Sequence, residues 1–205
     1  MDVLKAIFSR RSCHNFDSRD IEPEKIDKIL EAARWAPSPS NSQPWEFIVI
    51  TDRDAIHRLY ELSEKAKKSG VVELRGFSFI RPLPENVKEE ERPAIHYSLK
   101  FLKDVPLVIG VVGIPASTIK QSLVERTGDP YKYACAAAIQ NMLLAAEGQG
   151  LASLWFTMYD PALVSRFLQV DRTKHLLALV CIGYPAGKLS HSDRIALNQK
   201  VRWIK

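Results

Sequence analysis

The segment 105–113 is apolar along its whole length, and it constrains the fold more than any other stretch of the chain. Its sequence, V-P-L-V-I-G-V-V-G, contains no charged or polar side chain. A strand that is apolar on both faces belongs in the centre of a sheet that helices cover on each side. The other predicted strands are 45–50, 151–156 and 176–182. Four strands with helices between them predict an α/β or α+β fold, with a central sheet between helical layers.

Apolar residues at helical spacing, together with capping residues, predict the helices. They cover residues 2–9, 22–36, 53–68, 95–103, 131–147 and 160–168. The helix 131–147 is rich in alanine and apolar around most of its girth, which is typical of a buried helix. Its small side chains would let another helix approach closely, either within the chain or across a dimer. Of these two, we expect burial against a second subunit.

The length and composition favour one domain spanning residues 1–205, or at most two small ones. At 205 residues, 46% of them hydrophobic, the chain can bury a sizeable core. Residues 69–95 lack helical or strand periodicity and are punctuated by glycine and proline. Such a segment is typical of a lid or binding loop, and a variable surface insertion is the alternative.

Several classes of protein are excluded by what the sequence lacks. It has no run of about eighteen apolar residues that could span a membrane, and its N-terminus lacks the apolar core of a signal peptide. The cysteines Cys13, Cys135 and Cys181 are far apart, which favours reduced thiols in a cytoplasmic protein over a disulfide framework or a zinc site. We therefore expect no membrane association and no metal.

The charge pattern favours a small anionic ligand over nucleic acid. The net charge is +5, and the basic residues are scattered, without an aromatic-interleaved stripe. Dinucleotide and phosphate-loop glycine motifs, the serine-hydrolase elbow and paired acid/base carboxylates are also missing. No catalytic side chain is therefore predicted, and any enzymatic chemistry would belong to a cofactor.

The loop 36–45 has a defined shape because its three prolines at 37, 39 and 44 cannot continue a helix. It presents uncharged hydrogen-bonding side chains, which suit the rim of a planar heteroaromatic ligand. The alternative is a rigid connector in which serine and asparagine simply close turns.

A second candidate site follows the first helix at Arg10, Arg11 and Ser12, with His14 two residues further on. Guanidinium groups bind phosphate bidentately, and a serine adds a neutral donor. The alternative is that the two arginines only complement the dipole of the helix end. At the other end of the chain, Lys188 and Arg194 lie in a polar tail.

Four motifs in the correct order resemble the FMN-dependent nitroreductase family. They are S-R-R-S at 9–12, A-P-S-P-S-N-S-Q-P-W at 36–45, Q-N-M-L-L-A-A at 140–146 followed by G-L-A-S-L-W at 150–155, and I-G-Y-P at 182–185. Arg194 stands where the family has a C-terminal basic residue. The resemblance implies an α+β fold with three layers, whose central, mostly antiparallel sheet is flanked by helices, and an intertwined homodimer with FMN at the interface.

The same resemblance implies an NAD(P)H-dependent flavin oxidoreductase. NADH or NADPH would deliver hydride to flavin N5 in a ping-pong cycle, and the reduced flavin would pass it to a nitroaromatic, quinone or enone. Reductive dehalogenation and oxygen-dependent flavin fragmentation are alternatives within the family. A non-enzymatic flavin- or nucleotide-binding module is the alternative outside it.

The family motifs also imply roles for single residues. The FMN phosphate and ribityl chain would be held by Arg10, Arg11 and Ser12, with His14 nearby and added charge from Lys188 and Arg194. The isoalloxazine ring would be contacted from the partner subunit by Pro37, Ser38, Pro39, Asn41 and Gln43. Backbone at Thr157 and Met158 would approach the N5 edge. The sequence departs from common members at Thr157–Met158, where Glu-Gly is frequent, at Ala134, where many carry aspartate, and at Ala152, usually glycine.

Overall fold

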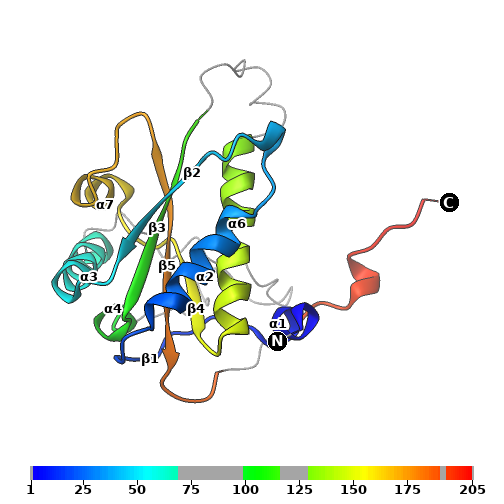
Figure 1. The fold of residues 1–205 in the computed structure, drawn as a ribbon, viewed down its shortest axis with the longest axis horizontal. Helices are drawn as coiled ribbons and strands as arrows, with labels where there is room; N and C mark the ends of the chain where they lie inside the picture. The colour runs from blue at the N-terminus through cyan, green and yellow to red at the C-terminus, as the bar shows by residue number, and fades with distance from the viewer. Residues whose placement is uncertain (1, 69–98, 116–128, 190–192, 205) are drawn as a thin grey trace, which may run out of the picture.

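The computed structural model describes residues 2–68, 99–115, 129–189 and 193–204. Within them the chain forms three layers, a five-stranded sheet with helices on both faces (Figure 1). The helices are α1 Val3–Ser9, α2 Pro23–Arg34, α3 Arg53–Lys68, α4 Phe101–Asp104, α6 Pro130–Gly148 and α7 Pro161–Phe167. The strands are β1 Phe16–Asp17, β2 Trp45–Ile50, β3 Leu107–Gly113, β4 Ala152–Phe156 and β5 His175–Pro185. The predicted α+β class is confirmed.

The sheet is built around the pair β3 and β5. Its order is β1-β5-β3-β2, with β4 also paired to β5, and these pairings are antiparallel. In the centre of β3, Ile109 lies opposite Val49 on β2 and Val180 on β5. All seven residues of β3 are buried, which confirms its predicted central position.

Alternate residues of β3 enter two separate hydrophobic cores, because successive side chains of a strand point to opposite faces. Leu107, Ile109 and Val111 pack into the core beneath α2 and α6. Val108 and Val112 pack into the core beneath α3, α4 and α7. Figure 1 shows these two groups of helices on either side of the sheet.

Helix α6 is buried in good part within its own chain, between the sheet and α2. Eight of its residues are buried, among them Ala138, Ile139 and Met142. One side of α6 faces the sheet, while another packs against α2 at Ile29 and Ala33. Small alanine side chains allow this close helix approach, as expected.

Two strand predictions were incomplete. The last strand extends over His175–Pro185 instead of stopping at 182, because the strand β1 pairs with its end at Phe16↔Pro185 and Asp17↔Tyr184. Strand β1 was not predicted, since two residues are too short to show periodicity.

The helix predicted over 95–103 is seen as α4 Phe101–Asp104, with residues 95–98 outside the described part. The expected lid at 69–95 also lies outside it.

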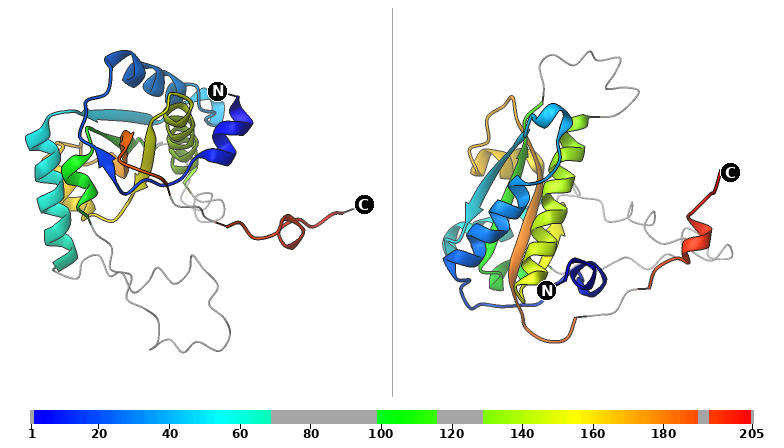
Figure 2. Two further views of the ribbon diagram at one scale, coloured as in Figure 1. Left: turned by 90° about the horizontal axis from the view of Figure 1, so that it is seen from below. Right: turned by 45° about the vertical axis from the view of Figure 1, so that its right-hand side comes forward.

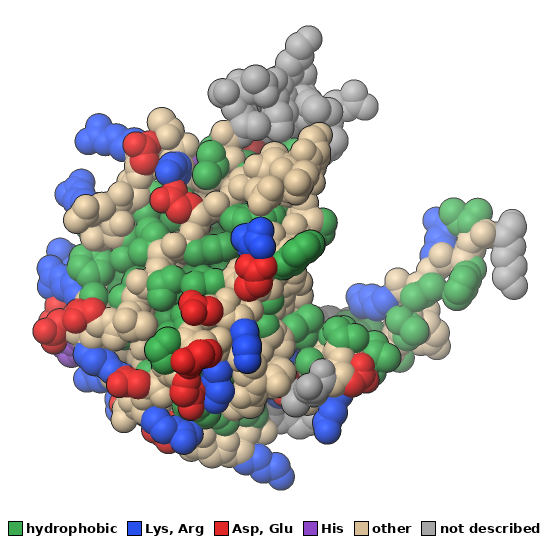
Figure 3. Space-filling view, in the orientation of Figure 1, with side chains coloured by type: hydrophobic (Ala, Val, Ile, Leu, Met, Phe, Trp, Pro, Cys, Tyr) green, Lys and Arg blue, Asp and Glu red, His purple; other side chains and the backbone are tan. Residues whose placement is uncertain are grey.

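Both ends of the chain carry exposed apolar side chains. On α1, Val3, Leu4, Ile7 and Phe8 are 45–71% exposed, whereas Ala6 alone of this helix is buried. The C-terminal arm 193–204 leaves the body of the molecule (Figure 2) and includes Trp203, 80% exposed. Green hydrophobic side chains are visible along this arm in Figure 3.

Among the described residues, none of the helices has the length and hydropathy needed to cross a membrane.

The central strand offers a direct test of the packing. Ile109→Ala should lower the free energy of unfolding by about 2–5 kcal/mol, because Ile109 is fully buried and truncation leaves a cavity. Ile109→Val, which removes one methylene, should cost about 0.5–1.5 kcal/mol. Urea unfolding followed by tryptophan fluorescence measures both. Equal, small losses in the two variants would contradict a tightly packed centre.

Candidate functional site

The side chain of Arg11 closes the C-terminal end of α1. Its Nη1 donates to the carbonyl oxygens of Phe8 at 2.7 Å, Ser9 at 3.1 Å and Arg10 at 2.8 Å. The last carbonyls of a helix lack partners within it and carry partial negative charge, so a guanidinium group there is favourable. Of the two roles considered for this arginine, the helix-end role is therefore observed.

Charged side chains from distant parts of the sequence act on Arg10. Burial lowers the pKa of its half-buried guanidinium group; the carboxylate of Glu147 raises that pKa, and the positive charges of Arg194 and Arg11 lower it. The positive charge of Arg194, from the other end of the sequence, therefore acts on Arg10. Guanidinium groups that act on one another in this way favour a bound anion such as phosphate.

A hollow of about 320 Å³ adjoins the chain after Arg11. It is lined by Ser12, His14, Asn15, Ala186, Gly187, Lys188 and Leu189. Three predicted ligand residues, Ser12, His14 and Lys188, therefore meet in one cavity although they come from opposite ends of the sequence. Two hydrogen bonds join the segments, from Asn15 Nδ2 to the Ala186 carbonyl at 3.1 Å and from Ala186 N to the Asn15 carbonyl at 3.0 Å.

The backbone beside this hollow is fixed by the sheet. Ser12 forms an isolated bridge with Ser153 of β4, and Cys13 N donates to the Ser153 carbonyl at 3.0 Å. The His14 ring lies edge-on to Phe101, with ring centroids 5.8 Å apart. Burial lowers the pKa of His14, so its neutral form is favoured. The hollow therefore combines one permanent cation, Lys188, with a histidine that titrates below its usual range.

The loop 36–45 is held in a strained conformation. It contains the short 3₁₀ helix η1 Pro39–Asn41, with left-handed backbone at Ser40 (φ 51°), Asn41 (φ 53°) and Gln43 (φ 48°). Such angles are costly for residues other than glycine. Gln43 N donates to Ser38 Oγ at 2.9 Å, so the Ser38 side chain closes the turn. The turn-closing alternative is thus observed for Ser38, while Pro37, Pro39, Asn41 and Gln43 are exposed.

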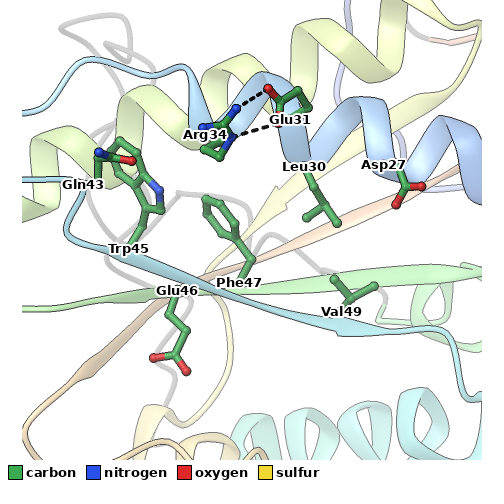
Figure 4. Close-up of a pocket in the computed structure, with 9 residues that line it drawn as sticks. All are labelled: Asp27, Leu30, Glu31, Arg34, Gln43, Trp45, Glu46, Phe47 and Val49. Carbon is green, nitrogen blue, oxygen red and sulfur yellow. Dashed lines mark hydrogen bonds and ion pairs between the residues drawn. The ribbon is translucent and has the colours of Figure 1, made fainter. Parts of the chain in front are cut away.

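A larger hollow of about 630 Å³ lies between α2 and β2, next to this loop (Figure 4). Its lining consists of Asp27, Leu30, Glu31, Arg34, Gln43, Trp45, Glu46, Phe47 and Val49. Arg34 donates to both carboxylate oxygens of Glu31, at 2.9 and 2.6 Å. Hydrogen bonds from Arg34 and then Trp35 lower the pKa of Glu31 to about 2. Gln43 is the predicted ligand residue that borders this hollow.

Helix α6 keeps the loop and the charge cluster apart within one chain. Near its start, Cys135 Sγ lies 3.4 Å from the Pro44 carbonyl, and near its end Glu147 accepts a hydrogen bond from Ser9. These twelve residues of helix span about 18 Å at 1.5 Å per residue. The structure therefore brings Ser12, His14 and Lys188 together in one hollow but does not bring the loop residues to them.

The remaining predicted residues follow β4. Thr157 is exposed, and Met158 is half-buried against the core beneath α3. Glu147 was not predicted from the sequence, although an acidic residue at a helix C-terminus is unfavourable and was a usable signal. Asn15 was not predicted either, because its role depends on contact with the distant Ala186 and left no local signal. The described residues contain no group of three or more metal-ligating side chains.

The sequence model of the Nitroreductase family matches residues 7–184. The chain belongs to the nitroreductase family. Among curated relatives, this nitroreductase-family chain is 29% identical over 210 residues to a putative NADH dehydrogenase/NAD(P)H nitroreductase of Methanothermobacter thermautotrophicus, covering 97% of this chain and 88% of the relative. It is also 29% identical over 188 residues to the 5,6-dimethylbenzimidazole synthase of Rhodospirillum rubrum, covering 90% and 82%.

Solved structures agree with this assignment. A BluB-like flavoprotein from Clostridium difficile 630 superposes with a TM-score of 0.77 at 24% identity, covering all of both chains. An FMN-dependent nitroreductase from Clostridium difficile R20291 superposes with a TM-score of 0.67 at 25% identity, covering 98% of each chain. The nitroreductase-like fold is confirmed, and the chain is an oxidoreductase of this family.

The histidine in the small hollow predicts a pH effect on stability. Because burial lowers the pKa of His14 below its unfolded value of about 6.5, the unfolded chain takes up the proton more readily. The free energy of unfolding should therefore fall as pH drops below about 6.5. His14→Asn should flatten this dependence between pH 7 and 5 in urea unfolding, with His57→Asn on α3 as the control. An unchanged slope in His14→Asn would contradict the partial desolvation of this imidazole.

Proposed function

We propose that this chain binds FMN and uses NADH or NADPH to reduce electron-poor acceptors such as nitroaromatics, quinones or enones, in ping-pong order. The observation that carries the proposal is the hollow that brings Ser12 and His14, just after Arg10 in the sequence, together with Lys188 from the other end of the chain. The positive charge of Arg194 also acts on Arg10. This donor set fits a phosphate monoester with a polar chain attached. FMN, when bound, supplies the hydride chemistry that the side chains lack.

The charge cluster would hold the phosphate end of the cofactor. Guanidinium forks match phosphate oxygens, and each charge-assisted hydrogen bond contributes about 1.5–3 kcal/mol. Arg10 is the best placed of the arginines, because the Arg11 side chain is engaged with the end of α1. Ser12 and Lys188 would continue the contacts from the phosphate along the ribityl chain.

The ring end of the cofactor requires a second copy of the chain. The loop residues Pro37, Ser38, Pro39, Asn41 and Gln43 lie at the far end of α6 from the arginines, about 18 Å away along the helix. We infer a homodimer in which this loop contacts the flavin held by the partner. The exposed apolar side chains of α1 and of the arm 193–204 support burial in such an interface. Backbone at the exposed Thr157 would line the ring edge.

An absorption spectrum tests this function directly. The purified protein, supplied with FMN and then freed of excess, should show two flavin bands that bleach on anaerobic addition of NADH or NADPH. Reoxidation by a quinone or nitroaromatic should restore them. A protein that stays colourless after incubation with FMN would overturn the proposal.

The phosphate contact predicts the effect of one substitution. Arg10→Ala should weaken FMN binding about ten- to hundredfold, the equivalent of one lost charge-assisted bond. Retained flavin and a fluorescence titration measure this loss. Arg166→Ala, which removes an exposed positive charge from α7, is the matched control. Full flavin occupancy in Arg10→Ala would show that the clamp is misplaced.

The dimer predicts the effect of another substitution. Phe8 is 71% exposed on α1, so Phe8→Asp should leave the fold intact and shift the protein from dimer towards monomer. Phe8→Leu should preserve the dimer. Sedimentation velocity at several concentrations distinguishes the two states, and a dimer that is unaffected by Phe8→Asp would exclude α1 from the interface.

Flavin fragmentation is a second candidate, favoured by one observation. The synthase from Rhodospirillum rubrum is 29% identical over 90% of this chain, and its named product shares the dimethylbenzene ring of flavin. Incubating the reduced holoprotein with oxygen and analysing the products by mass spectrometry separates the candidates. Release of dimethylbenzimidazole would favour fragmentation, whereas recovery of intact FMN would favour the acceptor reductase.

A further inference from the structure

Tyr184 joins the end of β5 to the start of α2. Its hydroxyl donates to Glu22 Oε2 at 2.6 Å and accepts a hydrogen bond from Lys25 Nζ at 2.5 Å. Glu22 and Lys25 also form an ion pair of 3.0 Å, so the three polar groups close a triangle. An ion pair this exposed contributes little to stability by itself. The tyrosine hydroxyl instead uses the pair to connect two elements that are distant in sequence.

The ring of Tyr184 makes a second connection, to the chain just after β1. The guanidinium carbon of Arg19 lies 3.7 Å from the ring centroid, which is the geometry of a cation–π contact. Arg19 follows Asp17, the residue of β1 that pairs with Tyr184. A strand of two residues makes too few ladder bonds to hold the chain firmly. The side chain of Tyr184 therefore strengthens a weak strand pair.

This weak pair lies directly beside the small hollow. One wall of the hollow comes from the segment 12–15, which leads into β1, and the other comes from 186–189, which leaves β5. Where the strand pair ends, two hydrogen bonds between Asn15 and Ala186 join the walls. Lys188 lies two residues further on. Its distance from the opposite wall therefore depends on how firmly β1 is held to β5.

We propose that Tyr184 is a positioning residue for FMN binding, which fixes the end of β5 against α2 and thereby sets the position of Lys188 in the hollow. This role rests on the proposed FMN function. Tyr184 does not line the hollow and acts only through the segment that follows it. A cofactor that enters a preset hollow orders few groups, whereas loosened walls must be ordered as it binds, which weakens affinity.

Tyr184→Phe is the informative variant, because it keeps the ring beside Arg19 and removes only the hydroxyl. FMN affinity should fall about three- to tenfold, the scale of one hydrogen bond. The dissociation constant is measured on the full chain, freed of flavin, by quenching of flavin fluorescence. Tyr60→Phe on α3 makes the same change on the opposite face of the sheet and is the matched control.

Hydrogen exchange tests the walls without any ligand. The Ala186 amide donates to the Asn15 carbonyl at 3.0 Å, so its exchange with deuterium reports on opening of the junction between the walls. In the flavin-free protein this amide should exchange faster in Tyr184→Phe than in the wild type or in Tyr60→Phe. Mass spectrometry of peptides that cover 180–189 measures the rate.

A double-mutant cycle separates positioning from a general loss of stability. Lys188→Met removes the positive charge from the hollow and keeps a long, flexible side chain. If Tyr184 acts by placing Lys188, Tyr184→Phe should lower FMN affinity in the wild-type background and have little further effect in Lys188→Met.

The outcomes distinguish this role from the proposed function. Equal losses of FMN affinity in both backgrounds would overturn the positioning role, since the effect would then be structural. Unchanged FMN affinity or unchanged Ala186 exchange in Tyr184→Phe would also overturn it. Wild-type protein that binds no FMN would overturn the proposed function itself. A loss of affinity that requires Lys188, together with faster exchange at Ala186, supports the role of Tyr184.

Discussion

The structure depends on the burial of β3 and β5 from both faces. Neither strand presents a polar face to water through the centre of the sheet, so helices must cover both sides. Helix α6 is the longest element on one side, and its own apolar girth then requires α2 as an outer cover. Hydrophobic burial thereby fixes the direction of α6. The positions of the loop 36–45 and of the arginine cluster follow from it, because each is attached to one end of that helix.

The site uses the helix ends in a way that hydrophobic packing alone does not explain. Where α1 meets the end of α6, one arginine neutralises the final carbonyls of α1, and a carboxylate of α6 is held by Ser9. The positive charges of Arg194 and Arg11 act on Arg10, and the carboxylate of Glu147 offsets them in part. Such an imbalance favours a bound anion. The cluster is therefore better suited to a ligand than to stabilising the empty chain.

Elements with strong local patterns were predictable from the sequence, whereas contacts between distant segments were not. The all-apolar strand at 107–113 and the alanine-rich helix were found because their patterns are internal to each element. Strand β1 has two residues and exists only through its pairing with Tyr184 and Pro185. The sequence allowed the arginines after α1 either to bind phosphate or to complement the helix end, and only the structure shows that Arg11 takes the second role. Likewise, the sequence left turn closure open for the serines of the loop 36–45, and the structure shows it for Ser38.

The separation of the loop 36–45 from the arginines within one chain has a thermodynamic consequence for the proposed dimer. A flavin held by the arginines of one chain and by the strained loop of another contacts both subunits at once. Any ligand that binds the dimer more tightly than the monomer stabilises the dimer by the same factor. The strain at Ser40, Asn41 and Gln43 adds to this coupling, since a loop preset in left-handed conformations loses little further freedom on binding. Binding of the cofactor and association of the subunits are then thermodynamically linked, because the length of α6 keeps the loop and the arginines apart within one chain.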